Sequence, residues 1–178
     1  AMQNNTTGSN NAAFGGSALA ANLVGNNNVA FGYGSLLANT AGNNNVAIGY
    51  QSMAANTTAS NLLAVGYQAM YSNTTGADNI SLGSQNMRSN TTGSVNVSMG
   101  GQASYANTTG FANTSMGYRA AYATTTGYGN TSMGDSALRS NVLGSNNVAI
   151  GRKTGALRAA YNNSTFVGQG ADASVTGL

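Results

Sequence analysis

Hydrophobic and polar residues follow a short pattern that returns every 17 residues along the chain. The residue before the pattern's fixed glycine is always apolar, and the residue two positions earlier is mostly β-branched. Because side chains alternate between the two faces of a strand, this pattern predicts a short β-strand before each glycine. The glycines occur without insertion or deletion at Gly15, Gly32, Gly49, Gly66, Gly83, Gly100, Gly117, Gly134, Gly151 and Gly168.

The second half of each repeat carries another apolar column, found at Leu19, Leu36, Met53, Met70, Met87 and Leu138. An Asn-Thr-Thr-Gly turn signature follows it at 73–76, 90–93 and 107–110. Asn and Gly tolerate left-handed backbone conformations, so these segments predict turns. Each coil is therefore expected to contain a strand, a glycine bend, a second strand and a turn. A 17-residue period is too short for a helix-containing repeat, which predicts an all-β solenoid of ten parallel coils.

Side-chain size differs sharply between the two faces of the first strand. Bulky apolar residues lie on one face, and the other face carries only small residues until Phe166 interrupts the column. A column that stays small indicates that another backbone packs against it, so both faces are expected to be buried. A coil of 17 residues can bury only one face within itself, which predicts association with other chains. The small residues are Ala13, Ala30, Ala47, Ala64, Ser81, Ser98, Ser115, Ser132 and Ala149.

Stacked coils also explain the unusual composition. The 178 residues include 25 Gly but no Pro, Cys, His or Trp, and only 5% are charged. Like charges stacked about 4.8 Å apart would repel by about 1 kcal/mol per pair even in water. Asparagine amides can instead hydrogen-bond to one another along the stack. One such ladder is expected, interrupted by Thr124, at Asn22, Asn39, Asn56, Asn73, Asn90, Asn107 and Asn141.

The same composition argues against several functions. The six basic residues are scattered, whereas a nucleic-acid-binding protein is expected to carry a dense basic stripe. There is no His or Cys, and Asp78, Asp135 and Asp172 belong to three different coils, so no catalytic, cofactor or metal site is expected. No apolar run approaches the roughly 20 residues of a membrane span, so direct membrane insertion is not expected.

Three copies of the strand carry a recognisable motif at residues 28–32, 45–49 and 147–151, with the sequences Asn-Val-Ala-Phe-Gly, Asn-Val-Ala-Ile-Gly and Asn-Val-Ala-Ile-Gly. They resemble the Asn-x-Val-Ala-Ile-Gly head repeats of trimeric autotransporter adhesins (YadA-like heads), over about 11–166. The resemblance implies a left-handed parallel β-roll in which three identical chains pack around an axis. The Asn-Thr-Thr-Gly spacer looks more like repeats of phage or phage-like tail fibres. This chain departs from the adhesin heads in its longer 17-residue period, and in lacking a coiled-coil stalk and membrane anchor.

Two columns of large side chains form the candidate contact surface. If they face outward, their aromatic and guanidinium groups suit stacking on sugars or contact with a protein receptor. The alternative is that they cover the solenoid wall or a seam between chains. The candidates are Tyr33, Tyr50, Tyr67 and Tyr118 in one column, and Tyr71, Arg88, Tyr105, Tyr122 and Arg139 in the other. Arg139, Arg152, Lys153 and Arg158 also gather near the C-terminal end, as a cluster for an anionic glycan or as solvated charges.

These observations predict a non-enzymatic, adhesive segment of a homotrimeric extracellular fibre that binds a receptor or glycan or spaces a distal tip. It is expected on a bacterial surface, anchored through regions outside the sequence. A tail-fibre shaft on a phage-like particle is the alternative, and an ice-binding solenoid is less favoured. Residues 1–10 are expected to be a partial leading coil with a cloning junction, 11–162 the regular repeats, and 163–178 a divergent coil with a truncated end.

Overall fold

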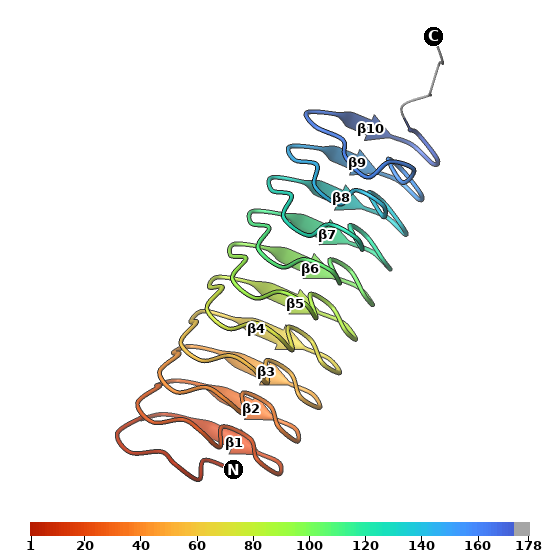
Figure 1. Ribbon diagram of the computed structural model, residues 1–178. Coiled ribbons are helices and arrows are strands. Elements are labelled where there is room, and N and C mark those ends of the chain that lie inside the picture. Colours follow the sequence, from red (N-terminus) through yellow and green to blue (C-terminus); the bar gives the residue numbers. More distant parts are fainter. Residues whose placement is uncertain (173–178) are drawn as a thin grey trace.

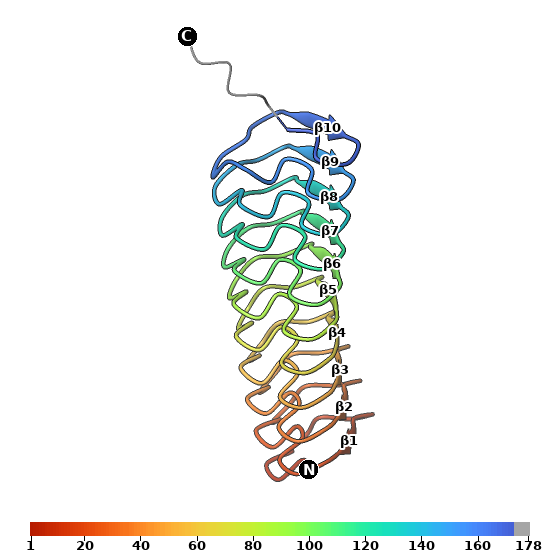
Figure 2. The same cartoon turned by 90° about the vertical axis from the view of Figure 1, so that its right-hand side faces the viewer.

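The computed structural model describes residues 1–172 as a straight β-solenoid of about nine turns, with no helix in that range. Figure 1 shows the coils stacked in sequence order, and Figure 2 shows the strands aligned along one side of the stack. The strands within these residues are β1 (Ala12–Phe14), β2 (Val29–Phe31), β3 (Val46–Ile48), β4 (Leu63–Val65), β5 (Ile80–Leu82), β6 (Val97–Met99), β7 (Thr114–Met116), β8 (Thr131–Met133), β9 (Val148–Ile150) and β10 (Thr165–Val167).

All ten strands of the described chain form one parallel sheet in the order β1 to β10, and each residue pairs with the residue 17 positions away. Ala30 pairs with Ala47, for example, and Met99 with Met116. The separation in sequence between paired residues therefore equals the 17-residue period of the repeat. The prediction of an all-β solenoid with one strand before each glycine is confirmed.

The prediction of a second strand after each glycine is wrong, because that segment is a series of turns. Alternate residues there have a left-handed backbone, such as Gln51 (φ 51°) and Met53 (φ 50°). These residues change the direction of the chain within a few positions, which an extended strand cannot do. Hydrogen bonds between coils continue nevertheless, as from the Gln51 amide to the Tyr33 carbonyl at 2.8 Å.

The glycine bend depends on two constraints at the same position. Gly66 has a φ of +139°, a conformation that side chains rarely adopt. A Cβ atom at Gly66 would also lie 2.4 Å from the carbonyl oxygen of Gly83 in the next coil. The backbones therefore touch directly at the bend, and only glycine fits there.

The small column of the strand faces the interior of the solenoid. Ala47 and Ala64 are fully buried, and the Leu/Met column of the turn segment packs beside them, as at Met53. The bulky column points outward and remains accessible in the single chain. The expectation that both strand faces are buried is therefore met within one chain only for the small face.

The predicted asparagine ladder is confirmed from Asn22 to Asn107, whereas Asn141, beyond the interruption, accepts a hydrogen bond from the Tyr161 amide. Side-chain amides donate from coil to coil over 2.7–3.2 Å along Asn22, Asn39, Asn56, Asn73, Asn90 and Asn107. Thr124 then interrupts the ladder by donating to the backbone carbonyl of Asn141. The Oδ1 atom of Asn107 is consequently buried without a hydrogen-bond donor.

A second asparagine ladder precedes the strands and was not anticipated. The backbone N–H of Asn28 donates to Oδ1 of Asn11, and the side-chain amide of Asn28 donates to the carbonyl of Gly42 in the next coil. Its signal was present in the sequence as asparagine at 17-residue spacing. The ladder, interrupted by Leu62, comprises Asn11, Asn28, Asn45, Asn79, Asn96, Asn113, Asn130 and Asn147.

The last described coil keeps the strand but exchanges large and small side chains inside. Gly155 occupies the Leu/Met column, and Phe166 occupies the small column. A Cβ at Gly155 would lie 3.1 Å from the Phe166 ring, so that ring fills the space left by the missing side chain. Tyr161 packs edge-on against Phe166 with the ring centroids 4.9 Å apart. The two rings extend the core at this end.

Thr124→Asn is expected to raise the free energy of unfolding by about 1–3 kcal/mol, because it supplies the donor that Asn107 Oδ1 lacks. Chemical denaturation followed by circular dichroism measures the change. Asn73→Thr is the matched control and is expected to destabilise, since it leaves Oδ1 of Asn56 without its donor. A Thr124→Asn variant no more stable than the parent chain would contradict this account of the ladder.

Candidate functional site

The first candidate column forms an exposed row of tyrosines immediately after the glycine bend. Tyr33, Tyr50 and Tyr67 stack in succession with ring centroids 5.6 Å apart and nearly parallel planes. About half of each side chain is exposed to solvent. Ser84 and Gly101 interrupt the column before Tyr118, so the structure places Tyr118 apart from the other three. The outward orientation that the candidate surface requires is present.

The second candidate column pairs tyrosines with arginines. The Arg88 guanidinium lies 5.4 Å from the centre of the Tyr71 ring, and Tyr105 stacks on Tyr122 at 5.2 Å. These tyrosines are half-buried. Arg139 is exposed and stands apart from the stacked rings. The contacts thus join four of the five candidates of this column into two groups.

A glutamine column lies between the two candidate columns and was missed by the sequence reasoning. Gln68 donates to Gln51 at 3.0 Å, and Gln102 donates to Gln85 at 3.1 Å. The Arg88 side chain donates to Oε1 of Gln68 at 3.1 Å. Four identical glutamines at 17-residue spacing were a visible signal. They connect the flanking columns into one continuous surface.

Arg119, also missed, ends the glutamine column and joins both aromatic columns. Its guanidinium lies 5.0 Å from the Tyr118 ring centre and 5.4 Å from that of Tyr122, and its Nε donates to Gln102 at 3.0 Å. The three columns therefore form one surface, here called the tyrosine-arginine wall. It comprises Tyr33, Tyr50, Gln51, Tyr67, Gln68, Tyr71, Gln85, Arg88, Gln102, Tyr105, Tyr118, Arg119, Tyr122 and Arg139.

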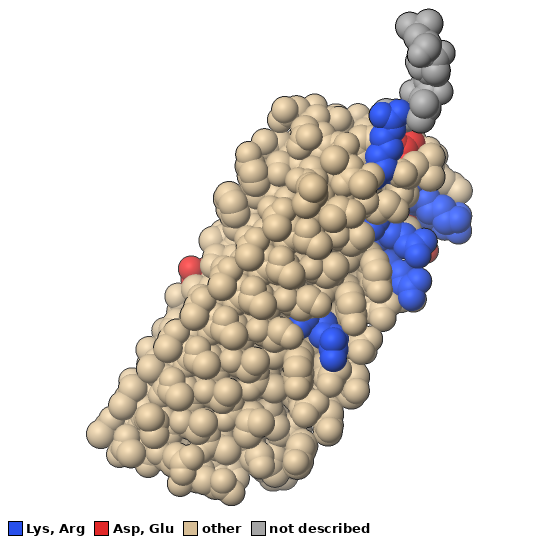
Figure 3. All heavy atoms as spheres, viewed as in Figure 1, with Lys and Arg blue, Asp and Glu red and all other residues tan. Residues whose placement is uncertain are grey.

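Positive charge is concentrated towards one end of the solenoid. All six Lys and Arg residues follow residue 87, and Figure 3 shows them gathered mainly along one edge of the C-terminal half. The ion pair between Arg152 and Asp135 spans 3.9 Å with both side chains about half exposed, so it contributes little to stability. The C-terminal half of this edge therefore presents net positive charge to an approaching partner.

A second uncovered surface lies on the outer face of the sheet. The residues at the first and third positions of each strand point outward; all are apolar except three threonines, and none is charged. Phe14, Phe31 and Val167 are 54–68% exposed, and Ile48 and Ile150 about 40%. The rings of Phe14 and Phe31 stack 4.9 Å apart. This apolar face follows β1 to β10 along the described chain.

The described residues also bear on other kinds of site. Residues 1–172 contain no group of three or more His, Cys, Asp or Glu side chains able to hold a metal ion. Within the same range, no helix is long and apolar enough to cross a lipid bilayer. Comparison of the chain with models of known protein families, with curated proteins and with solved structures gives no match.

Tyr161 is the group whose ionisation the fold changes most clearly. Its side chain is buried beneath the last coil, and its hydroxyl donates to the Asp172 carboxylate. Burial and this hydrogen bond raise the pKa of Tyr161 to about 12, against a smaller lowering by Arg158. The Tyr161 hydroxyl therefore stabilises the last coil through this hydrogen bond only while it is protonated.

The stability of the last coil is expected to fall as the pH rises from about 10 to about 12. The folded pKa of Tyr161 exceeds its ordinary value of 10.0, so the stabilisation is complete below pH 10 and lost through the folded pKa. Hydrogen exchange of the last coil across this pH range measures the loss. Tyr161→Phe is expected to flatten the pH dependence, whereas Tyr33→Phe on the wall retains it. An unchanged pH profile in Tyr161→Phe would refute the assignment.

Proposed function

We propose that this chain is an adhesive segment of a trimeric extracellular surface fibre that binds a receptor or glycan through the tyrosine-arginine wall. The observation that carries the proposal is the combination of two uncovered surfaces along the length of one solenoid. The apolar face calls for a partner that covers it permanently, whereas the wall is polar enough to remain in water and still stack on a ligand. The first surface supports assembly and the second supports recognition.

Copies of this same chain are the partner proposed for the apolar face. The face repeats at every coil, so a partner that follows it along ten strands needs side chains at the same spacing. A second copy has that spacing by construction. The uncharged side chains of the face can also meet their equivalents without repulsion. Burial of such apolar rows stabilises association by about 25 cal/mol for each Å² removed from water.

The number three and a left-handed coil rest on the resemblance of the strand motif to YadA-like heads. In the copy at 45–49, each residue of the motif has a distinct structural role. Asn45 belongs to a buried ladder, Val46 and Ile48 form the apolar face, Ala47 lines the interior, and Gly49 makes the bend. A repeat in which assembly and folding use alternate residues of one strand suits a fibre. The proposed location is a bacterial surface or a phage-like particle.

Recognition is proposed for the wall because its side chains suit carbohydrates. Exposed tyrosine rings provide flat apolar surfaces, and glutamine and arginine provide hydrogen bonds beside them. Each group recurs in successive coils, so a ligand with repeating units can be contacted at several coils at once. Repeated weak contacts raise the overall affinity well above that of any one contact.

Light scattering is expected to give a mass three times that of the 17.7 kDa chain, together with a β-type circular dichroism spectrum. Replacing Ile48 and Met116 on the apolar face with Glu is expected to give single folded chains, because buried like charges oppose association. Thr92→Glu on an exposed turn is the matched control and is expected to keep the assembly. A parent chain of single-chain mass at all concentrations would exclude the trimer.

Attachment to a target cell surface or glycan array is expected to fall at least about tenfold when Tyr50, Tyr67, Arg88 and Tyr118 are replaced with Ser. The substitutions remove stacking surface and a cation from the wall, and each stacked aromatic contact contributes about 0.5–1.5 kcal/mol. Thr58→Ser, Thr75→Ser and Thr92→Ser, on another exposed column, form the control variant. Undiminished attachment by the four-residue variant would leave a fibre shaft that only spaces a distal tip.

A further inference from the structure

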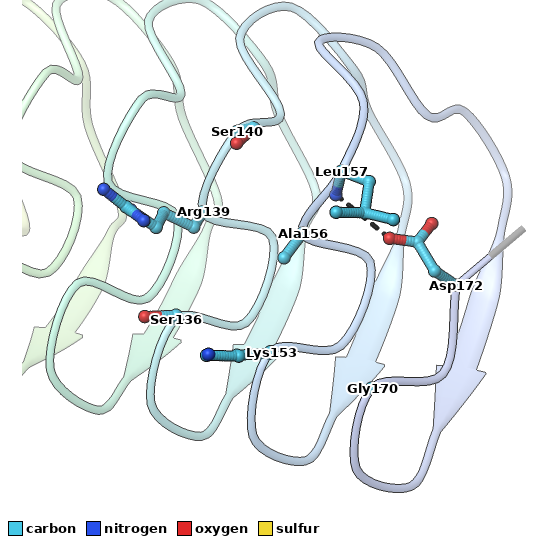
Figure 4. Close-up of a pocket in the computed structure, with 8 residues that line it drawn as sticks. All are labelled: Ser136, Arg139, Ser140, Lys153, Ala156, Leu157, Gly170 and Asp172. Carbon is cyan, nitrogen blue, oxygen red and sulfur yellow. Dashed lines mark hydrogen bonds between the residues drawn. The ribbon is translucent and has the colours of Figure 1, made fainter.

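A cavity of about 450 Å³ opens where the tyrosine-arginine wall reaches the last coils. Residues of three successive coils line it, among them Ser136, Arg139, Lys153 and Leu157. Figure 4 shows these side chains on the turn segments of successive coils. The volume lies within the range of about 300–1,000 Å³ that small-molecule sites occupy. No candidate for the proposed contact surface other than Arg139 lines this cavity.

The hollow exists because two columns of the wall lose their long side chains at this point. One column carries Tyr or Arg in five successive coils, from Tyr71 to Arg139, and then Ala156. The neighbouring column carries Lys153 and then Gly170. The space that a tyrosine and a glutamine occupy elsewhere on the wall is therefore open here, and a ligand can enter it without moving the backbone.

Charge within the cavity is separated between its two ends. Arg139 and Lys153 extend the same way at one end, and neither forms an ion pair within residues 1–172. Asp172 lies at the opposite end, where it accepts hydrogen bonds from the Leu157 amide at 3.0 Å and from the Tyr161 hydroxyl. Figure 4 shows this carboxylate directed toward Leu157, at the other end of the cavity from the two cations. The two cations remain available to a negatively charged ligand.

The remaining lining fits the other parts of an acidic sugar. Ala156 and Leu157 provide an apolar patch, and Leu157 is 80% exposed, as a surface that receives the C–H face of a sugar ring must be. Ser136 and Ser140 add hydroxyl groups beside the cations. Arginine binds carboxylates through two parallel hydrogen bonds, which fixes the orientation of the anion as well as attracting it.

We infer that this cavity binds the carboxylate-bearing residue of an acidic saccharide, with Arg139 and Lys153 holding the carboxylate and Ala156 and Leu157 supporting the ring. The inference rests on the proposed role of the wall in binding glycans and names the chemical class that its C-terminal end selects. Neutral sugars stack on the tyrosines further along the wall, whereas the cavity requires a negative charge.

Titration calorimetry with a short oligogalacturonate tests this inference on the whole chain. Binding is expected to weaken at least about tenfold with the methyl-esterified oligosaccharide, which keeps the rings and removes the charge. It is expected to weaken also as the salt concentration rises, because the cations are exposed. A polyglutamate peptide that binds as tightly as oligogalacturonate would overturn sugar recognition in favour of simple charge attraction.

Two variants separate charge from shape in the cavity. Arg139→Gln with Lys153→Gln removes the cations, and Ala156→Tyr fills the hollow while both charges remain. Each is expected to reduce oligogalacturonate affinity at least tenfold, and circular dichroism establishes that the variants remain folded. Thr92→Gln, on an exposed turn outside both the cavity and the tyrosine-arginine wall, is the control and is expected to leave the affinity within about twofold.

The outcomes distinguish this inference from the proposed function on which it rests. Undiminished oligogalacturonate binding by the cavity variants overturns the cavity, while loss of attachment in the variant of Tyr50, Tyr67, Arg88 and Tyr118 still supports the wall. No binding of the parent chain to oligogalacturonate also overturns the cavity. If the parent chain attaches to no glycan or cell surface at all, the proposed adhesive function fails as well.

Discussion

The backbone hydrogen bonds between successive coils are the interaction on which this structure depends, because they require every position to pack against a copy of itself. The requirement is strictest at the bend, where the backbones of Gly66 and Gly83 touch. In the interior it selects side chains that satisfy one another, such as Asn73 and Asn90 in the buried ladder. Repeated charge is disfavoured for the same reason, which accounts for a chain with only 5% charged residues.

Departures from the repeat mark the places where the molecule differs locally. Thr124 ends one ladder and leaves Oδ1 of Asn107 unsatisfied. Gly155 and Phe166 exchange large and small side chains, so a side chain of the strand instead of the turn segment fills the core of the last coil. Ala156 and Gly170 end two columns of long side chains and leave the cavity open. Each local feature therefore arises where one or two columns change identity.

Outward side chains form rows because each coil stacks on a copy of itself. A side chain that points outward in one coil points outward in the next, so an apolar column becomes an apolar face and a tyrosine column becomes a stacked row. Both proposed surfaces are consequences of this geometry. A fibre that assembles along one face and binds along another needs only different columns of a single repeat, and its reach increases with the number of coils.

The amino-acid sequence alone predicts the 17-residue period, the strand before each glycine and the interruption of the ladder at Thr124. Each of these depends only on equivalent residues of successive coils packing against one another. The candidate columns at Tyr50 and Tyr71 follow in the same way. The turn conformation at Gln51 and Met53, the contacts of the glutamine column with its neighbours, Arg119 between two rings and the cavity beside Ala156 did not follow. They depend on how different columns lie beside one another around the coil. That arrangement is set by the backbone path through the turns, and only the tertiary structure decides it.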